Sequence, residues 1–184
     1  MAEHGALENL TVLDLTRVLA GPFCTMMLAD MGANVIKIEI PNGGDDTRSY
    51  PPFREKNLHG ERESLYFANI NRNKKGITLN LKAPEGKAVF KKLVEKADIV
   101  VENYRPGVMD KLGLGYDVLK EINPRLIYAA VSGFGCYGPY HLRPGYDILA
   151  QAMGGMMAIT GPKGGSPTRA GSALGDMLGG LHVT

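Results

Sequence analysis

Residues 10–38 read LTVLDLTRVLAGPFCTMMLADMGANVIKI. The apolar run at 10–15 has the length of a buried strand, and residues 23–31 have the length and composition of a helix. Gly32 stands where the end of a helix favours glycine, and residues 35–38 form a second apolar run. Because the links are short, the stretch predicts a strand–helix–strand unit with two parallel, right-handed strands.

The same alternation continues along the chain. We expect further strands at residues 77–81, 99–101 and 126–131, and helices at 84–96, 107–112, 118–122, 146–157 and from about 176 onward. Residues 40–63 are polar and rich in Pro and Gly, which predicts a long loop. The sequence therefore predicts an α/β fold of the doubly wound kind: an open, mainly parallel sheet with helices on both faces.

Composition excludes several classes of protein. The 184 residues are 44% hydrophobic and 22% charged, which indicates one globular domain with a sizeable core. A net charge of +2 without a basic run argues against a nucleic-acid partner. No apolar stretch approaches the roughly 20 residues needed to cross a bilayer, so we expect no membrane partner. Cys24 and Cys136 are far apart, which favours free thiols and a cytoplasmic location.

The common catalytic motifs are missing. No GxGxxG follows the first predicted strand, and the chain has no phosphate loop, nucleophile elbow or zinc motif. Its four histidines show no ligand spacing, so we expect no metal. Carboxylates and backbone amides remain. Asp176 lies where a loop meets an apolar helix, and the residues alone leave two roles open for it, helix N-cap and nucleophile.

The apolar helix that begins near Asp176 runs to Thr184 with no polar tail. We expect from this that the chain is the beginning of a longer protein. The alternative is a docked terminal helix two turns long.

Eight ordered segments together resemble one family, the class III CoA-transferases, also called CaiB/BaiF. The segments are LDLTRVLAGP (13–22), GANVIKIE (32–39), GGDDTR (43–48), NRNKK (71–75), VENYRPG (101–107), SGFG (132–135), RPGYD (143–147) and GD (175–176). Their order and spacing hold across almost the whole chain.

The resemblance implies an organisation in domains. The family has a large Rossmann-like domain that binds CoA and a small domain that follows it, and two chains interlock as linked rings. Residues 1–184 would then be the N-terminal part of the large domain, without the small domain and the returning C-terminal segment. We expect a homodimer in the full-length protein and little or no activity from the 184 residues alone.

The resemblance also implies a reaction. CoA or acyl-CoA would be a substrate, with an acyl-CoA donor, a carboxylic acid acceptor and no tightly bound cofactor. Asp176 would attack the thioester to give a mixed anhydride, and the released thiolate would convert this into an aspartyl-CoA thioester. The acceptor acid would then reverse both steps. A carboxylate used in this way must be ionised and shielded from water.

Site residues carry over by position. The family's substrate contacts match Tyr146, Gly133, Phe134 and Gly135. Its CoA contacts match Arg17, Val18, Ala20, Asn73, Lys74, Lys75, Asn103, Tyr104 and Lys111. Arg48 has two interpretations, a contact to a phosphate or carboxylate of the substrate and a surface ion pair with Asp45.

Two alternatives to CoA transfer remain. The family also contains 2-methylacyl-CoA racemases, whose motif is Gly-His-Asp where this chain has Gly145-Tyr146-Asp147. Tyrosine, with an ordinary pKa near 10, is a poor proton shuttle where histidine serves well, so Tyr146 favours transfer. The other alternative is a non-catalytic nucleotide-binding domain. The sequence does not indicate which acids are the donor and the acceptor.

Overall fold

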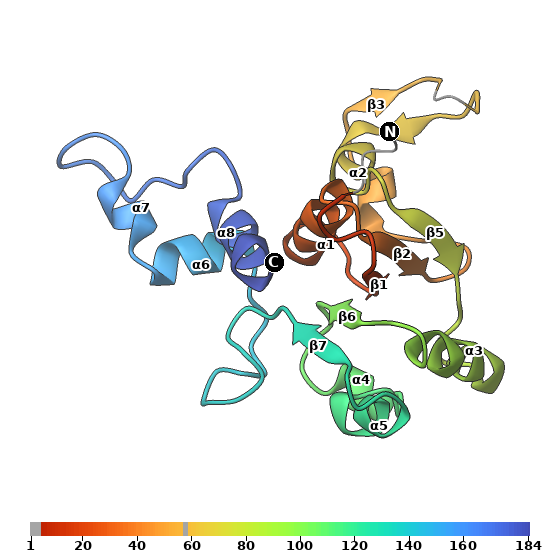
Figure 1. The fold of residues 1–184 in the computed structure, drawn as a ribbon. Coiled ribbons are helices and arrows are strands. Elements are labelled where there is room, and N and C mark those ends of the chain that lie inside the picture. The colour runs from red at the N-terminus through yellow and green to blue at the C-terminus, as the bar shows by residue number, and fades with distance from the viewer. Residues whose placement is uncertain (1–4, 57–58) are drawn as a thin grey trace.

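The centre of the protein is a five-stranded parallel sheet with the strand order β5-β2-β1-β6-β7 (Figure 1). A computed structural model describes residues 5–56 and 59–184. The strands are β1 (Thr11–Asp14), β2 (Asn34–Glu39), β5 (Lys75–Thr78), β6 (Ile99–Glu102) and β7 (Ile127–Ala130). β2 and then β5 lie on one side of β1, and β6 and then β7 lie on its other side. This confirms the predicted α/β fold.

Helices cover both faces of the sheet, because alternate strand residues point to opposite sides. On one face Leu13 and Val100 pack in a cluster with residues of α3 (Pro84–Val94), α4 (Val108–Lys111) and α5 (Tyr116–Ile122). On the other face Val12 and Val101 pack with residues of α1 (Ala20–Asp30). The sheet is thus the middle layer of three.

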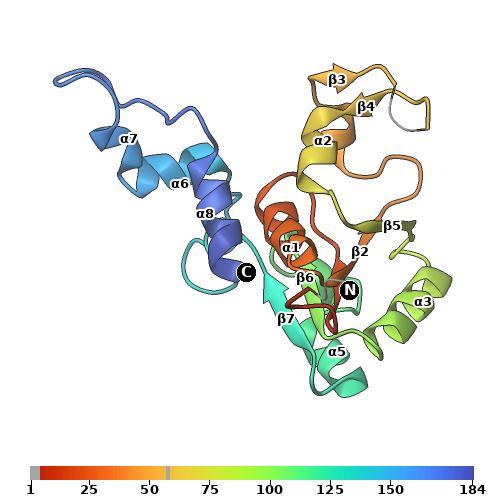
Figure 2. The same ribbon diagram turned by 45° about the horizontal axis from the view of Figure 1, so that its top comes forward.

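The last helices form a separate group beside α1. They are α6 (Asp147–Met153), α7 (Met156–Ile159) and α8 (Leu174–Val183), and α8 lies between α1 and α6 (Figures 1 and 2). The approach of α8 to α1 is close, since a methyl group on Gly180 would lie 2.4 Å from the carbonyl oxygen of Ala20. None of the helices in the described part of the chain is long and apolar enough to cross a membrane.

Two predictions of local structure were wrong, and one helix was missed. The predicted loop 40–63 contains the 3₁₀ helix η1 (Asp46–Ser49) and the hairpin of β3 (Phe53–Arg54) and β4 (Glu63–Ser64); residues 57 and 58 of the loop lie outside the described part. The helix α2 (Leu65–Ile70), capped by the Ser64 hydroxyl, was not predicted. The strand predicted at 77–81 corresponds to β5, which begins two residues earlier, at Lys75, and ends at Thr78. It is an exposed edge strand that begins with a lysine, so it lacks the apolar run of a buried strand.

Two helix predictions also need correction. The helix predicted at 146–157 is two helices, because the chain breaks at Gly154 and Gly155, and Gly155 adopts a φ of 81°. The last helix begins at Leu174 with Ala173 as its N-cap residue. Asp176 therefore lies within the first turn and makes no capping hydrogen bond, so its interpretation as an N-cap was wrong.

Candidate functional site

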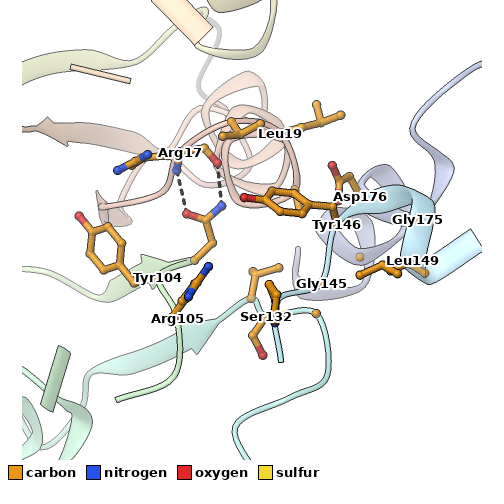
Figure 3. A pocket seen from close by; sticks show the side chains of 18 of the residues that line it. Arg17, Leu19, Tyr104, Arg105, Ser132, Gly145, Tyr146, Leu149, Gly175 and Asp176 are labelled. Carbon is orange, nitrogen blue, oxygen red and sulfur yellow. Dashed lines mark hydrogen bonds between the residues drawn. The ribbon is translucent and has the colours of Figure 1, made fainter. Parts of the chain in front are cut away.

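A pocket of about 740 Å³ opens where β1, β6 and β7 end (Figure 3). The sheet changes its direction of growth between β1 and β6, and ligands of open α/β sheets bind at the carboxyl ends of the strands at such a point. Residues 17–20, 103–106 and 131–134 line the pocket directly after the three strands. Residues of α6 and α8, Asp176 among them, close its opposite side.

The Asp176 carboxylate is half-buried in this pocket and accepts no hydrogen bond from the described residues. Burial is the main cause that raises the pKa of Asp176, the nearby Asp147 carboxylate raises it further, and Arg169 acts in the opposite direction. A carboxylate with free oxygens and incomplete solvation is a stronger nucleophile than one bound by several donors. Asp176 is thus available to react with a ligand in the pocket.

Tyr146 lies beside the same end of the pocket. It is the residue before α6, and its side chain is largely exposed. In Figure 3 Tyr146, which directly precedes α6, and Asp176 of α8 lie on one side, whereas Arg17, Tyr104 and Arg105 lie on the other. The pocket therefore has an end with a carboxylate and an end rich in cations.

The loop after β1 is held by Asn103, which follows β6. Asn103 Oδ1 accepts from the Arg17 N–H at 2.8 Å, and Asn103 Nδ2 donates to the Arg17 carbonyl at 2.7 Å (Figure 3). Val18 follows with a φ of 67°, which is costly for a β-branched residue, and its N–H donates to Asp45 Oδ1 at 3.2 Å. The two strand ends are thereby fixed to each other at the pocket wall.

Gly133 and Gly145 bring two further loops of the wall into contact. A methyl group on Gly133 would lie 2.3 Å from Gly145 Cα, so only glycine allows this approach. Both residues line the pocket, as does Phe134, whose ring packs edge-on against Tyr140. The contact places the loop after β7 against the turn that leads to Tyr146.

The structure brings together only part of the set that the sequence analysis singled out. The pocket is lined by Asp176, Tyr146, Gly133, Phe134, Arg17, Val18, Ala20, Asn103 and Tyr104. Five other residues of the set lie outside its lining: Gly135, Asn73, Lys74, Lys75 and Lys111.

Lys74 differs most from the expected CoA contact. Its ammonium is inside the protein, where it donates to Asp14 Oδ2 at 3.0 Å, to the Pro22 carbonyl at 3.0 Å and to Asn71 Oδ1 at 2.9 Å. Burial lowers the pKa of Lys74, and the Asp14 charge opposes this shift. An ammonium has three protons, and all three are used by these contacts.

The other four residues are at the surface. Asn73 donates to Asp30 Oδ1 at 2.8 Å, and Lys75 donates to Asn34 Oδ1 at 2.7 Å. Lys111 is the exposed last residue of α4, and Gly135 is exposed in the loop after β7. Arg48 does not pair with Asp45, as one interpretation had it; it binds Glu39 through Nη2 at 2.6 Å and Nε at 2.8 Å.

The sequence analysis missed two cations of the pocket wall, Arg105 and Arg143. Neither has a carboxylate partner among the described residues, and the Arg143 guanidinium lies 4.2 Å from the centre of the Tyr140 ring. Arg17, by contrast, forms an ion pair with Asp46. A signal was present, because both missed arginines begin the triplet Arg-Pro-Gly at the end of a strand or loop that enters the pocket.

The site holds no group of ligands for a metal. In residues 5–56 and 59–184 no three His, Cys, Asp or Glu side chains meet in a way that could bind an ion. Among the described residues, what the pocket offers to a ligand is the free carboxylate of Asp176, two guanidinium groups without a carboxylate partner, aromatic rings and loop backbone, while its second carboxylate, Asp46, is paired with Arg17.

The chain matches a known protein family. The model of CoA-transferase family III matches residues 7–184. Among curated proteins, the chain is 51% identical over 178 residues to "Succinyl-CoA:glutarate CoA-transferase" of Mus musculus, covering 96% of the chain and 39% of that protein. It is 52% identical over 180 residues to "Acetyl-CoA:oxalate CoA-transferase" of Acetobacter aceti, covering 97% of the chain and 45% of that protein. The chain thus spans less than half the length of these relatives.

Solved structures agree with the fold. A CAIB/BAIF family protein from Brucella suis is 44% identical, with a TM-score of 0.94 over 98% of this chain and 47% of that chain. A hypothetical protein from Mycobacterium tuberculosis is 37% identical, with a TM-score of 0.85 over 97% of this chain and 48% of that chain.

Proposed function

Since the chain belongs to CoA-transferase family III, we propose that it forms the N-terminal part of the CoA-binding domain of an acyl-CoA:carboxylate CoA-transferase, with Asp176 as the nucleophile. The activity, the substrates and the second half of the enzyme belong to the proposal, because the chain spans only part of its relatives. The observation that carries it is the free, half-buried Asp176 carboxylate in the pocket at the switch point of the sheet.

The proposed reaction uses Asp176 twice. Its Oδ attacks the carbonyl carbon of the acyl-CoA, the C–S bond breaks, and a mixed anhydride and CoA thiolate form. The thiolate attacks Asp176 Cγ, which releases the donor acid and leaves an aspartyl-CoA thioester. The carboxylate of the acceptor attacks this thioester, and the thiolate then attacks the acyl carbon of the new anhydride. Asp176 is restored and the acceptor leaves as its CoA ester.

Several features of the pocket support this role. The raised pKa of Asp176 reflects weak solvation, which favours attack and slows hydrolysis of an anhydride. Tyr146 lines the same pocket, and its hydroxyl would donate a hydrogen bond to an oxygen of the substrate from the side of Asp176. Arg17, Tyr104 and Arg105 at the other end offer charge and a ring to the phosphates and the adenine of CoA.

Racemisation is the less supported alternative. It needs a base that exchanges an α-proton near neutral pH, and the pocket lining contains no histidine in the described part of the chain. Tyr146 takes the position at which the resembling racemases carry histidine. We therefore propose transfer, and incubation in deuterated water separates the two, since a racemase would exchange the α-hydrogen without any acceptor acid.

We propose dicarboxylic acids as the substrates. Glutarate, oxalate and mesaconate appear in the names of the relatives. A dicarboxylate keeps one charged carboxylate while the other reacts, and the guanidinium group of Arg143 in the pocket wall, which has no carboxylate partner among the described residues, would balance that charge. A panel of acids with two to five carbons, each with its monocarboxylic analogue, tests this.

We further propose a cytoplasmic homodimer. Large apolar side chains are exposed in the second half of the chain, among them Tyr137 and Ile159, each with 88% of its surface exposed. Surfaces of this kind are normally covered by another segment or subunit. Cys24 is buried and Cys136 exposed, both unpaired, which suits a reducing compartment. Light scattering on the full-length protein would measure the oligomeric state.

The function is tested with the full-length protein, succinyl-CoA as donor and the panel of acids as acceptors. We expect CoA esters of the acceptors to form, and Asp176→Asn to reduce the rate by about a thousandfold or more. Asp117→Asn is the control, because Asp117 is exposed on α5 and its carboxylate binds, among the described residues, only Lys120 at 2.5 Å. Asp176→Asn activity within about tenfold of the unchanged protein would rule out the nucleophile.

A further inference from the structure

We infer that Asp147 is a positioning residue for Asp176: its buried carboxylate holds the segment that leads into α8 and sets the charge around the nucleophile. The inference rests on the proposed function, since it concerns how Asp176 is placed and ionised for the reaction. Asp147 was not among the site residues that the sequence indicated, although it is the neighbour of Tyr146.

The Asp147 carboxylate binds three groups at once. Its Oδ1 accepts from the Gly175 N–H at 2.9 Å and from Gln151 Nε2 at 3.0 Å. Its Oδ2 accepts from Arg169 at 2.9 Å (Nη2) and 3.1 Å (Nε), and Gln151 Nε2 is 2.9 Å away. Gly175 directly precedes Asp176, so the Asp147 carboxylate holds the backbone N–H of the residue next to the nucleophile.

Gln151 extends this attachment along the segment. Only 2% of its surface is exposed. Its Oε1 accepts from the Ala170 N–H at 2.9 Å, and its Nε2 donates to the Ser172 carbonyl at 3.3 Å. Two side chains one turn apart on α6 thus bind residues 169–175 at both ends and in the middle, and a segment with little regular structure is fixed to a helix.

The network also connects the helix that follows Tyr146 with the helix that carries Asp176. Tyr146 is the N-cap residue of α6, Asp147 is the first helical residue, and Asp176 lies in the first turn of α8. The helices touch at Gly175, where a methyl group would lie 2.8 Å from Ala150 Cβ and 3.2 Å from Asp147 Oδ1. A change at Asp147 therefore shifts Asp176 relative to Tyr146.

Charge is the second consequence. Burial would raise the pKa of Asp147, but hydrogen bonds from Gln151, Arg169 and the Gly175 N–H bring it below its ordinary value, so the group is ionised at neutral pH. That negative charge is one of the causes that raise the pKa of Asp176, after burial, and Arg169 lowers it. Asp147 and Arg169 thus act on the nucleophile with opposite signs.

Other titratable groups near α8 are few in the described residues. Tyr66 of α2 interacts with Asp176, since the Asp176 charge, after burial, raises the pKa of Tyr66. The helix α1 packs on α8 and carries Cys24 and Asp30, and α8 itself carries His182. Neither α6 nor α7 has a further titratable residue.

The test follows the acylation of Asp176 in the full-length protein as a function of pH. Hydroxylamine traps the acylated residue in a single turnover. In a plot of the acylation rate against pH, the decrease at low pH (the acidic limb) reports the ionisation of Asp176. Asp147→Asn retains an oxygen for the Gly175 N–H but removes the charge, so the limb should move to lower pH by about half a unit to one unit. Arg169→Gln should move it to higher pH by a similar amount.

Displacement of Asp176 gives a second readout. Asp147→Asn should lower kcat by about tenfold or more, with KM for acyl-CoA changed less than about twofold, because CoA itself is bound elsewhere in the pocket. Asp117→Asn should alter neither the limb nor kcat. Thermal unfolding shows which variants are folded. If Asp147→Asn does not fold, the inference is tested by whether the acidic limb of Arg169→Gln moves to higher pH as predicted.

The outcomes separate this inference from the proposed function. Suppose that Asp176 is acylated but the acidic limb of the pH profile stays in place in both Asp147→Asn and Arg169→Gln, or moves in the same direction in both. The role of Asp147 is then overturned, and the proposed function is left intact. If no acylation of Asp176 occurs in the unchanged protein with any donor, both the function and this inference are overturned.

Discussion

The Lys74 ammonium lies 3.0 Å from Asp14 Oδ2 in the interior of the protein, with 1% and 0% of the two side chains exposed. Asp14 ends β1 and also accepts from the hydroxyl groups of Thr16 at 2.5 Å and Thr25 at 2.7 Å. The pair joins β1 to the residue before β5. Asp14 also binds the N–H and hydroxyl of Thr16, so Lys74 is connected through Asp14 to the residue that precedes the pocket loop.

The adjacent lysines allow a direct comparison. Lys74→Met leaves the Asp14 charge buried without its main partner, which typically costs about 3 to 5 kcal/mol. Lys75→Met removes only an exposed contact with Asn34, which should cost less than about 1 kcal/mol. Urea unfolding of the full-length variants measures both free energies. Equal stability of the two variants would contradict the structural role of Lys74.

The adjacent glycines of α8 make a second matched pair. A methyl group on Gly180 would collide with the Ala20 carbonyl, so Gly180→Ala should separate α1 from α8 and cost about 1 to 3 kcal/mol. A methyl group on Gly179 meets no atom within 4 Å, so Gly179→Ala should stabilise the helix by about 0.5 to 1 kcal/mol. Thermal unfolding checks the sign of each change, and destabilisation by both would show that the helices are packed differently.

Glu102 gives the chain a pH dependence of its own. Burial raises the pKa of Glu102 from 4.5 to about 7, against the hydrogen bonds from the Tyr104 N–H and the Tyr128 hydroxyl. The folded state therefore holds the proton more tightly than the unfolded state, and stability decreases as the pH rises from about 4.5 to about 7.

Glu102→Gln removes this loss. The free energy of unfolding of the variant minus that of the unchanged protein should be larger at pH 8 than at pH 5, by at most about 3 kcal/mol. Urea unfolding of both proteins at both pH values measures this difference. Glu121→Gln, at an exposed position of α5, should show no such difference. An effect of Glu102→Gln that is the same at both pH values would contradict the raised pKa.

The sequence predicted the fold where local pattern and burial coincide. The apolar runs of β1, β2 and β6 lie inside the sheet as expected, because buried parallel strands need such runs. The apolar run of β7 also lies in the sheet, although β7 is an edge strand and Ile127 is exposed. The exposed edge strand β5 lacks one and was misplaced. The hairpin β3–β4 and α2 depend on contacts such as Ser64 Oγ with the Tyr50 carbonyl at 2.6 Å, which a local pattern cannot reveal.

The same distinction applies to the site. Arg17, Asn103 and Gly133 were singled out by position in the family pattern, and all three line the pocket because each follows the carboxyl end of a parallel strand. Lys74 looked like its neighbour Lys75, because the acidic partner that buries it is sixty residues away in the sequence. The Asp147 network joins residues 22 and 28 positions apart, and only the folded chain shows it.

The central claim is the covalent role of Asp176, and peptide mass spectrometry tests it most directly. The full-length protein is mixed with acyl-CoA, quenched with hydroxylamine or borohydride, and digested. We predict hydroxamate or reduced product at Asp176 alone, formed only with acyl-CoA and missing in Asp176→Asn. Turnover without any modification of Asp176, or modification of another residue that persists in Asp176→Asn, would contradict the account.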